Sequence, residues 1–206
     1  MRSGRKAQRD DRGFTIVEMT VVLSLIGVSL AVSWMLMQAA ANIADQAQAT
    51  SVASDEGRQA LDRITRDLRQ AQEATESMGA VGVIQPRQMT VYVDDGHDGR
   101  LDRVTYFVSG NSLMRKETSA TTTFPPYTFR TPESSPATLV ANLQPTWTGP
   151  IFEYWQNTEP PVAATYPDQV SSVSVQLLIT AACGRKTVVV NSQTWVKIRS
   201  VLNSIN

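Results

Sequence analysis

A long apolar run near the N-terminus constrains this chain more than any other feature. From Phe14 to Ala44 the only charged side chain is that of Glu18. The segment Phe14–Met37 would form about 36 Å of α-helix at 1.5 Å per residue, which is long enough to cross a bilayer. An acid in mid-membrane costs roughly 2.5–3.5 kcal/mol on an insertion scale, so such acids are usually functional and paired. The run therefore predicts a membrane helix with a functional carboxylate in its first turn.

The residues before this run are polar and basic. They include Arg2, Arg5, Lys6, Arg9 and Arg12. By the positive-inside rule this predicts a cytoplasmic N-terminus and an extracytoplasmic chain after about Met37. An ordinary secretory signal has its small residue after the apolar stretch. Here Gly13 precedes the stretch, so a cut after Gly13 would leave the helix on the mature protein.

Five hydroxyl side chains interrupt the apolar run. They are Thr15, Thr20, Ser24, Ser29 and Ser33. A membrane helix tolerates such hydroxyls because they can bond back to carbonyl groups of the helix itself.

Helical periodicity continues beyond the run. From Gln38 to about Ala74 there is no Pro, and small or apolar residues recur at intervals of four and three. This stripe comprises Ile43, Ala47, Thr50, Ser54, Gly57, Leu61, Ile64, Leu68 and Ala71, whereas Arg58, Asp62, Arg63, Arg66, Asp67 and Arg69 lie largely off it. We predict an amphipathic helix that packs on its own domain. A coiled-coil partner is the rival interpretation, but the small polar residues would make a poor seam.

The remaining chain has a period of two, which is typical of β-strands. A meander is predicted at Gln88–Val93, Asp102–Val108 and Ser112–Glu117, and closing strands at Val170–Ile179, Thr187–Val190 and Trp195–Arg199. The segment 118–167 is rich in Pro and Thr and carries scattered aromatic residues. We interpret it as an irregular region with short strands held in place by those aromatics.

The order of basic leader, Gly13, Phe14, Glu18 and apolar helix resembles the prepilin signal of bacterial type IV pilins and type II secretion pseudopilins. The resemblance implies an α+β pilin-like fold, in which a long helix crosses the membrane with its first half and packs on an antiparallel β-sheet domain with its second. It also implies that a prepilin peptidase cuts between Gly13 and Phe14 and methylates the new amino group, giving N-methylphenylalanine. Glu18 would then pair with the N-terminal amine of a neighbouring subunit during assembly. This is physically sensible, because a carboxylate buried in lipid needs a cation.

Four parts of the chain follow from this resemblance. They are a leader at 1–13, the membrane half of the helix at 14–37, its amphipathic extracytoplasmic half at 38–78 and a β-rich domain at 79–206. The expected location is the cytoplasmic membrane, with a single pass, and later a filament. The alternative is a plain signal anchor, in which Glu18 merely lies near the headgroups at the helix N-terminus.

Further segments are similar to the J-type minor pseudopilins of type II secretion. These are Leu61–Ala71, Asp98–Tyr106 and Leu113–Arg115. The finer resemblance implies a minor pilin or pseudopilin at or near the filament tip, where it helps to start assembly, and no enzyme activity. The implied partners are other pilin or pseudopilin subunits, the prepilin peptidase, the inner-membrane assembly platform and the lipid bilayer.

Two other classes of function are weighed against this one. The first is a binding module for DNA, a surface or a secreted protein, which would use the aromatic segment Phe124–Trp155. Aromatic side chains can stack on bases, but Arg130 is the only basic residue in that segment. Cleavage after Gly13 would leave 14 basic and 17 acidic residues, so no nucleic-acid partner is expected. The second is a membrane-anchored enzyme, but no nucleophile elbow is evident and His97 is the only histidine.

The acidic loop after residue 93 is a candidate calcium site. Asp94, Asp98 and Asp102 supply oxygens at the first, fifth and ninth positions of a calcium loop, with a Gly at the sixth. The third position is Gly96 and the twelfth is Thr105, where carboxylates or amides are expected. A hairpin turn explains the Asp-Gly pairs equally well, and both interpretations stay open.

Cys183 is the only cysteine, which excludes an intramolecular disulfide. We expect this thiol to be buried and inert, with intermolecular pairing as the alternative. Pilins that staple a C-terminal loop do so with two cysteines, so the chain departs from the major-pilin pattern.

Overall fold

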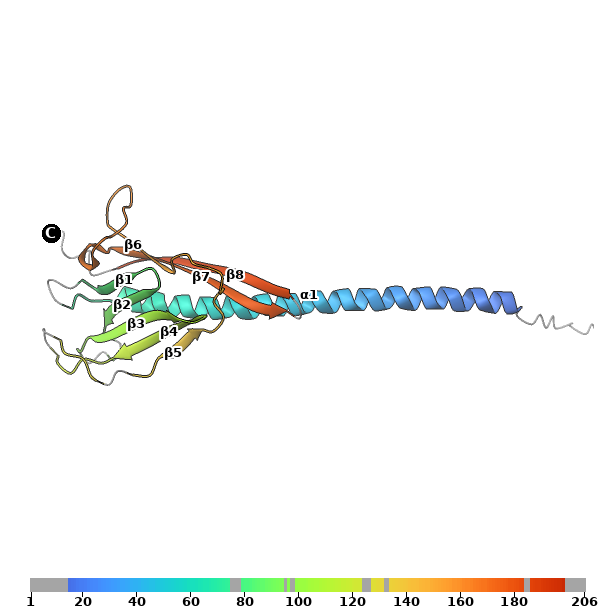
Figure 1. Cartoon of the computed structure of the whole chain (residues 1–206), viewed down its shortest axis with the longest axis horizontal. Coiled ribbons are helices and arrows are strands. Elements are labelled where there is room, and N and C mark those ends of the chain that lie inside the picture. Colours follow the sequence, from blue (N-terminus) through green and yellow to red (C-terminus); the bar gives the residue numbers. More distant parts are fainter. Residues whose placement is uncertain are drawn as a thin grey trace, which may run out of the picture. The chain divides into compact units, whose positions relative to one another are not determined.

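The computed structural model of the chain describes residues 15–74, 79–94, 96, 99–123, 127–131, 134–183 and 186–198. This part contains one long α-helix followed by two antiparallel β-sheets (Figure 1). The predicted α+β class is thereby confirmed. By its internal contacts the chain divides into two compact units, Met1–Asp45 and Gln46–Asn206.

Helix α1 (Ile16–Gln70) belongs to both units. After its last turn the chain joins a sheet, because Ala71 forms an antiparallel bridge with Val93 at the end of strand β2 (Gln88–Val93). The helix consequently ends one turn earlier than the predicted end near Ala74.

The first sheet is a five-stranded antiparallel meander with the order β1-β2-β3-β4-β5. Its other strands are β1 (Val81–Gln85), β3 (Asp102–Ser109), β4 (Ser112–Thr118) and β5 (Ala137–Val140). Strands β2, β3 and β4 match the predicted meander. The two-residue connection between β3 and β4 contains Gly110 with a φ of 59°, a left-handed conformation that glycine adopts without steric cost.

The second sheet has three antiparallel strands in the order β6-β7-β8. They are β6 (Phe152–Trp155), β7 (Ser172–Cys183) and β8 (Lys186–Lys197), and a short 3₁₀-helix, η1 (Pro167–Gln169), precedes β7. The prediction of two separate strands at the C-terminal end was wrong. The intervening residues 191–194 pair continuously with residues 175–178 of β7, so β8 is one strand.

The C-terminal part of α1 and both sheets share one hydrophobic core. The buried face of the helix comprises Ala53, Gly57, Ala60, Leu61, Ile64, Asp67 and Leu68. Alternate residues of the strands meet this face, among them Met89 and Val91 of β2, Val104 of β3, and Leu177 and Ile179 of β7. The predicted packing of an amphipathic helix on its own domain is confirmed.

The segment between β5 and β6 connects the two sheets through backbone hydrogen bonds. The N–H of Leu143 donates to the carbonyl of Asn111 at 2.7 Å, in the turn before β4. The N–H of Gln144 donates to the carbonyl of Leu178 in β7 at 2.8 Å. Both β5 and β6 lie within the region 118–167, which the sequence predicts to be irregular with short strands.

Gly57 lies in close contact with the second sheet. A Cβ atom at this position would lie 2.7 Å from Oγ of Ser192 in β8 and 2.9 Å from Cδ1 of Ile179 in β7. Both distances are shorter than van der Waals contact. A larger residue at this position would therefore require the side chains of Ser192 and Ile179 to shift.

We predict that Gly57→Ala lowers the free energy of unfolding by about 1 kcal/mol. Overpacking of a core costs roughly 1–3 kcal/mol, which exceeds the gain of about 1 kcal/mol in helix propensity. Thermal or urea unfolding of the full chain in detergent micelles would measure the difference. The double variant Gly57→Ala/Ser192→Ala removes the nearest atom and should recover part of the loss; equal stability of the single variant and the wild type would contradict the packing argument.

Candidate functional site

Glu18 lies in the first turn of α1 and is exposed. Its backbone N–H donates to Oγ1 of Thr15 at 3.3 Å, so Thr15 caps the helix. The pattern Thr-x-x-Glu is the sequence signature of such a cap, and it locates the start of the helix more sharply than hydropathy does. A carboxylate in this turn also interacts favourably with the positive end of the helix dipole.

The helix around Glu18 presents a large apolar surface. More than half of the side chain is exposed at most of the large apolar residues from Ile16 to Met37 and at Ile43. The helix is long and apolar enough to cross a membrane, by length and composition. Water is a poor solvent for such a surface, so lipid or other apolar helices must cover it.

The hydroxyl groups of this segment are satisfied within the helix, as predicted. Thr20 donates to the carbonyl of Ile16 at 2.8 Å, and Ser29 and Ser33 each donate at 2.8 Å to the carbonyl four residues earlier. Ser24 donates to the carbonyl of Val21 at 2.7 Å. Among the described residues the Glu18 carboxylate, by contrast, has no ion-pair partner. Within the described part of this apolar segment, Glu18 is the only charged group.

Gly13 and Phe14 lie outside the described residues. The cut between them and the methylation of Phe14 therefore stay predictions of the sequence.

Part of the acidic loop is held as a turn by a side-chain hydrogen bond. Oδ2 of Asp94 accepts a hydrogen bond from the N–H of Gly99 at 3.1 Å, and Gly99 has a φ of 77°. Asp102 is buried at the start of β3. Asp98 and His97 lie outside the described residues, and the described ones contain no group of three or more His, Cys, Asp or Glu side chains that could hold a metal ion. Calcium binding stays a prediction.

Cys183 is half-buried at the end of β7, rather than buried as the sequence suggested. Its partner on β8 is Lys186.

A charged cluster joins α1 to the first sheet. It contains Asp67, which the sequence pattern placed off the apolar stripe of the helix. Asp67 is fully buried in the last turns of α1. The phenol of Tyr106 donates to Oδ2 of Asp67 at 2.5 Å, and Nε of Arg115 lies 3.1 Å from the same oxygen. On the other side, Nε of Arg63 lies 3.4 Å from Oδ1, an ion-pair distance without hydrogen-bond geometry.

The position of Asp67 in the helical repeat indicates that its side chain is buried. It lies three residues after Ile64 and beside Leu68, both of which are fully buried. The position therefore belongs to the buried face of the helix. Charge alone assigned it to the exposed face, because buried acids are rare unless paired. The partners come from β3 and β4, which the sequence does not align with the helix.

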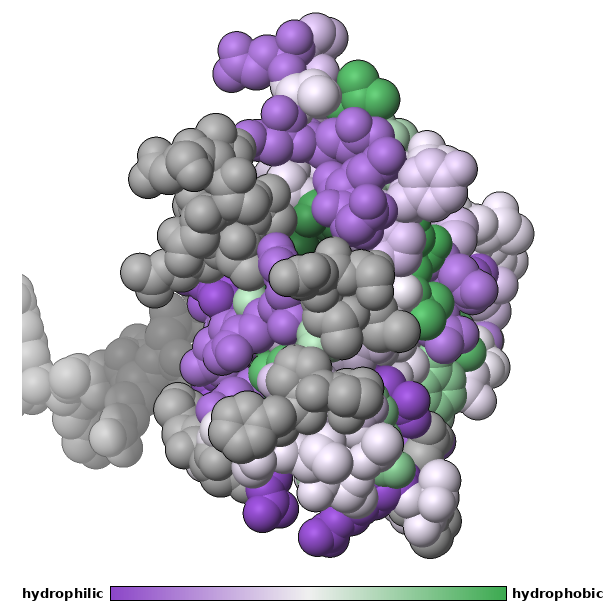
Figure 2. Space-filling view, turned by 90° about the vertical axis from the view of Figure 1, so that its left-hand side faces the viewer, coloured by the Kyte–Doolittle hydropathy of each residue, from purple (hydrophilic) through white to green (hydrophobic). Residues whose placement is uncertain are grey.

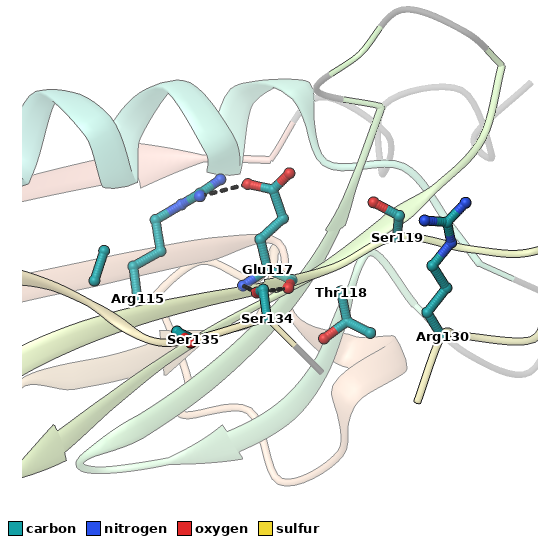
Figure 3. Close-up of a pocket in the computed structure, with 8 residues that line it drawn as sticks. Arg115, Glu117, Thr118, Ser119, Arg130, Ser134 and Ser135 are labelled. Carbon is teal, nitrogen blue, oxygen red and sulfur yellow. Dashed lines mark hydrogen bonds and ion pairs between the residues drawn. The ribbon is translucent and has the colours of Figure 1, made fainter. Parts of the chain in front are cut away.

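Burial and the nearby carboxylate of Asp67 raise the pKa of the Tyr106 phenol well above its ordinary value. The phenol thus stays protonated and remains a donor throughout the physiological range. Arg115 also bonds to Glu117, with Nη1 2.6 Å from Oε2, and it points from β4 toward α1 (Figure 3). The cluster is a structural clamp between helix and sheet.

A pocket of about 480 Å³ adjoins this cluster (Figure 3). Its lining residues are Arg115, Glu117, Thr118, Ser119, Arg130, Ser134, Ser135 and Ala137. Glu117 already makes two hydrogen bonds within the protein. Its carboxylate accepts from Nη1 of Arg115, and its backbone N–H donates to Oγ of Ser134. The described lining residues have the types of a polar surface hollow, and no histidine is among them.

The end of the domain opposite the β7–β8 hairpin carries no large apolar patch among its coloured residues. In Figure 2 hydrophilic residues predominate on this face, and the hydrophobic ones are scattered between them. Scattered apolar residues are normal on a protein surface.

A family model described as the prokaryotic N-terminal methylation motif matches residues 8–34. This range contains Gly13, Phe14 and Glu18 together with most of the apolar helix. No curated protein matches the chain.

We predict that Asp67→Ala lowers the free energy of unfolding by about 3 kcal/mol, because loss of one member of a buried pair leaves Arg115 and Tyr106 without their shared acceptor. Asp62→Ala is the matched control: Asp62 is an exposed aspartate on the same helix, and its loss should change stability by less than about 0.5 kcal/mol. Denaturant unfolding of the full chain in micelles gives both values. Similar effects of the two substitutions would refute the clamp.

Proposed function

We propose that this chain is a type IV pilin-like protein and that it serves in a filament as a minor pilin or pseudopilin at or near the tip, where it helps to start assembly. The methylation motif at residues 8–34 supports a pilin or pseudopilin subunit that is anchored in the membrane by α1. Such subunits assemble with other pilin subunits and are processed by the prepilin peptidase. They act as structural parts and not by catalysis.

The observation that carries the proposal is the lone carboxylate of Glu18 on an exposed apolar helix. Among the described residues it has no ion-pair partner, and the helix around it exposes almost only hydrocarbon. Two unit charges 4 Å apart attract by about 1 kcal/mol in water but by about 4 kcal/mol at an effective dielectric constant of 20. An amine that approaches Glu18 among packed apolar helices is therefore held more strongly than it would be in water.

We infer that this amine is the new N-terminus of a neighbouring subunit. A cut between Gly13 and Phe14 creates an α-amino group at the start of the same apolar segment. A neighbour displaced along the helix axis can bring its amine beside Glu18 while the apolar faces cover each other. Charge neutralisation would then favour the one axial stagger at which the two groups meet.

The orientation of the anchor is part of the proposal. The five basic residues of the leader favour a cytoplasmic N-terminus, which puts the domain outside the cytoplasm. In this orientation the inner-membrane assembly platform takes up the subunit. The machine to which it belongs is a type IV pilus or a type II secretion system.

The tip position is supported by the bulk of the domain. Beyond α1 the chain forms two sheets and a long connecting region instead of one small sheet. Such a volume is harder to repeat in every turn of a shaft than to place once at the end of a filament. The similarity of Leu61–Ala71 to the J-type minor pseudopilins points in the same direction.

The alternative of a DNA-binding or surface-binding module finds less support. The aromatic side chains of residues 127–155 mostly serve the fold: Phe152 and Tyr154 are buried, Trp147 packs on the core, and Phe129 stacks on Tyr92. Little aromatic surface is left in this segment to stack on a ligand.

We predict that Glu18→Gln reduces the amount of the chain recovered in filaments by about tenfold or more, because the loss of an ion pair worth about 1.4 kcal/mol changes an equilibrium tenfold. Glu18→Asp keeps the charge and should retain most of the incorporation. Immunoblots of sheared filament and membrane fractions measure the ratio. N-terminal sequencing should show Phe14 first in all three proteins, which separates assembly from processing. Normal incorporation of Glu18→Gln would defeat the proposed pairing.

The tip role makes a separate prediction. A small epitope tag after residue 198 should label one end of a filament in immunogold electron microscopy, and deletion of the gene should reduce the number of filaments more than their length. Labels distributed along the shaft would assign the chain to the shaft instead.

A further inference from the structure

Strand β8 forms an open edge of the second sheet. Among the described strands the order is β6-β7-β8, so β8 has a described neighbour on one side only. The other edge of β7 is hydrogen-bonded as well. It pairs with β6, and beyond β6 it bonds to the preceding loop through Gln176 with Ile151, Leu178 with Gln144, and Thr180 with Asn142. Among the described residues, no backbone hydrogen bond of β8 other than those to β7 is present.

The register shows which residues of β8 face the open edge. The carbonyl of Leu178 and the N–H of Thr180 point away from β8, since they bond to Gln144 and Asn142. Their partners on β8, Asn191 and Val189, are therefore the non-hydrogen-bonded pairs of the ladder. Both N–H and C=O of these β8 residues point outward. With a period of two, the same holds for Thr187, Gln193, Trp195 and Lys197.

The edge lacks the devices that usually protect a strand of this length. Its register with β7 is continuous over all twelve residues, with no bulge. Between Lys186 and Lys197 there is no charged residue and no Pro. The outward residues include apolar side chains that are about half exposed, Val189 at 46% and Trp195 at 53%. A long edge strand without a bulge, uncharged between its two terminal lysines, is a template for another strand.

The described helix and strands of the domain do not cover this edge. Helix α1 packs against the face of the sheet, because the nearest atoms to Gly57 are the side chains of Ser192 and Ile179 from two neighbouring strands. The first sheet is attached at the other side, beyond β6, where the N–H of Ile151 donates to the carbonyl of Pro86 at 2.8 Å and the phenol of Tyr154 donates to the carbonyl of Gln85 at 3.0 Å. The open edge therefore faces away from the rest of the core.

We propose that the free edge of β8 accepts an extended strand from a different subunit of the same filament, which adds a fourth strand to the second sheet. This inference rests on the proposed function, because it takes the partner from the filament. The outward backbone groups of Val189, Asn191 and Gln193 supply the hydrogen bonds. Val189 and Trp195 supply apolar contacts for alternate side chains of the added strand, and an uncharged segment with alternating β-branched residues fits best.

A second copy of this chain is a poorer occupant. Antiparallel pairing of two β8 strands would create a two-fold axis perpendicular to the sheet. The strand runs along the helical residues 46–70 of its own domain (Figure 1), so the two helices would point in opposite directions. Subunits of one filament are repeated with a single direction, which a two-fold axis of this kind violates.

Hydrogen exchange tests the proposal on the unmodified full chain. In dilute detergent micelles the amides of Val189, Asn191 and Gln193 should exchange rapidly, whereas those of Val190 and Ser192, which bond to β7, should exchange slowly. In isolated filaments the three outward amides should become slower by about a hundredfold or more, an opening cost of about 2.7 kcal/mol. Residue-resolved mass spectrometry measures this alternation. Outward amides that exchange equally fast in both states would overturn the proposal.

The same measurement distinguishes the possible occupants. If the outward amides become protected in the purified chain alone as its concentration in micelles rises, the occupant is a second copy and the assignment to a different subunit is wrong. If the wild-type chain does not enter filaments at all, the proposed function fails and the strand partner fails with it. If it enters while its outward amides stay unprotected, only the strand inference fails.

A pair of variants at one position gives an independent readout. Asn191→Pro removes an outward N–H and leaves the ladder to β7 intact, since Pro is tolerated where the N–H of an edge strand faces away from its neighbour. Asn191→Thr is the matched control, which keeps the N–H. We expect Asn191→Pro to be processed to Phe14 yet recovered in filaments at least about tenfold less than Asn191→Thr. Equal recovery would contradict the proposal, and if Asn191→Pro unfolds, the exchange comparison decides.

Discussion

The buried carboxylate of Asp67 is the contact on which the arrangement of the domain depends. It receives the phenol of Tyr106 and the guanidinium of Arg115 on one oxygen, and it is fully buried between α1 and the first sheet. An unpaired charge there would be very costly, so only one placement of the helix on β3 and β4 satisfies it. Hydrophobic contacts between the helix and the sheets tolerate small shifts, whereas this three-residue cluster does not. The clamp thus sets the position of the helix, and Gly57 then allows β7 and β8 to pack against it.

The two most informative carboxylates of the chain are satisfied in opposite ways. Asp67 finds its donors within the domain, and the result is rigidity. Glu18 lies on an exposed apolar helix and has no ion-pair partner among the described residues, and in the proposed assembly a neighbouring subunit supplies it. The edge of β8 is comparable, because its outward N–H and C=O groups have no backbone partner among the described residues. Both places offer polar groups that the proposed filament contacts would satisfy.

The sequence predicted the helix, the meander β2–β4 and the fold class correctly, because each depends on local periodicity. It was wrong where neighbours in space decide. The helix ends at Gln70 because Ala71 pairs with Val93, and the two predicted C-terminal strands form one strand because β7 pairs with the residues between them. The side of the helix on which Asp67 lies was misassigned for the same reason, since its donors come from strands about 40 or more residues away.

The sequence by itself determined the features that depend on composition and on residues close together in the chain: a membrane-length apolar helix, one acid in its first turn, and a methylation motif around Gly13 and Phe14. Each of these features can be recognised from a short stretch of sequence without knowledge of the fold. Only the tertiary structure decided which polar groups are paired and which are left open, because pairing joins residues that are distant in the chain. Asp67 became a closed clamp and β8 an open edge through contacts that no local pattern records.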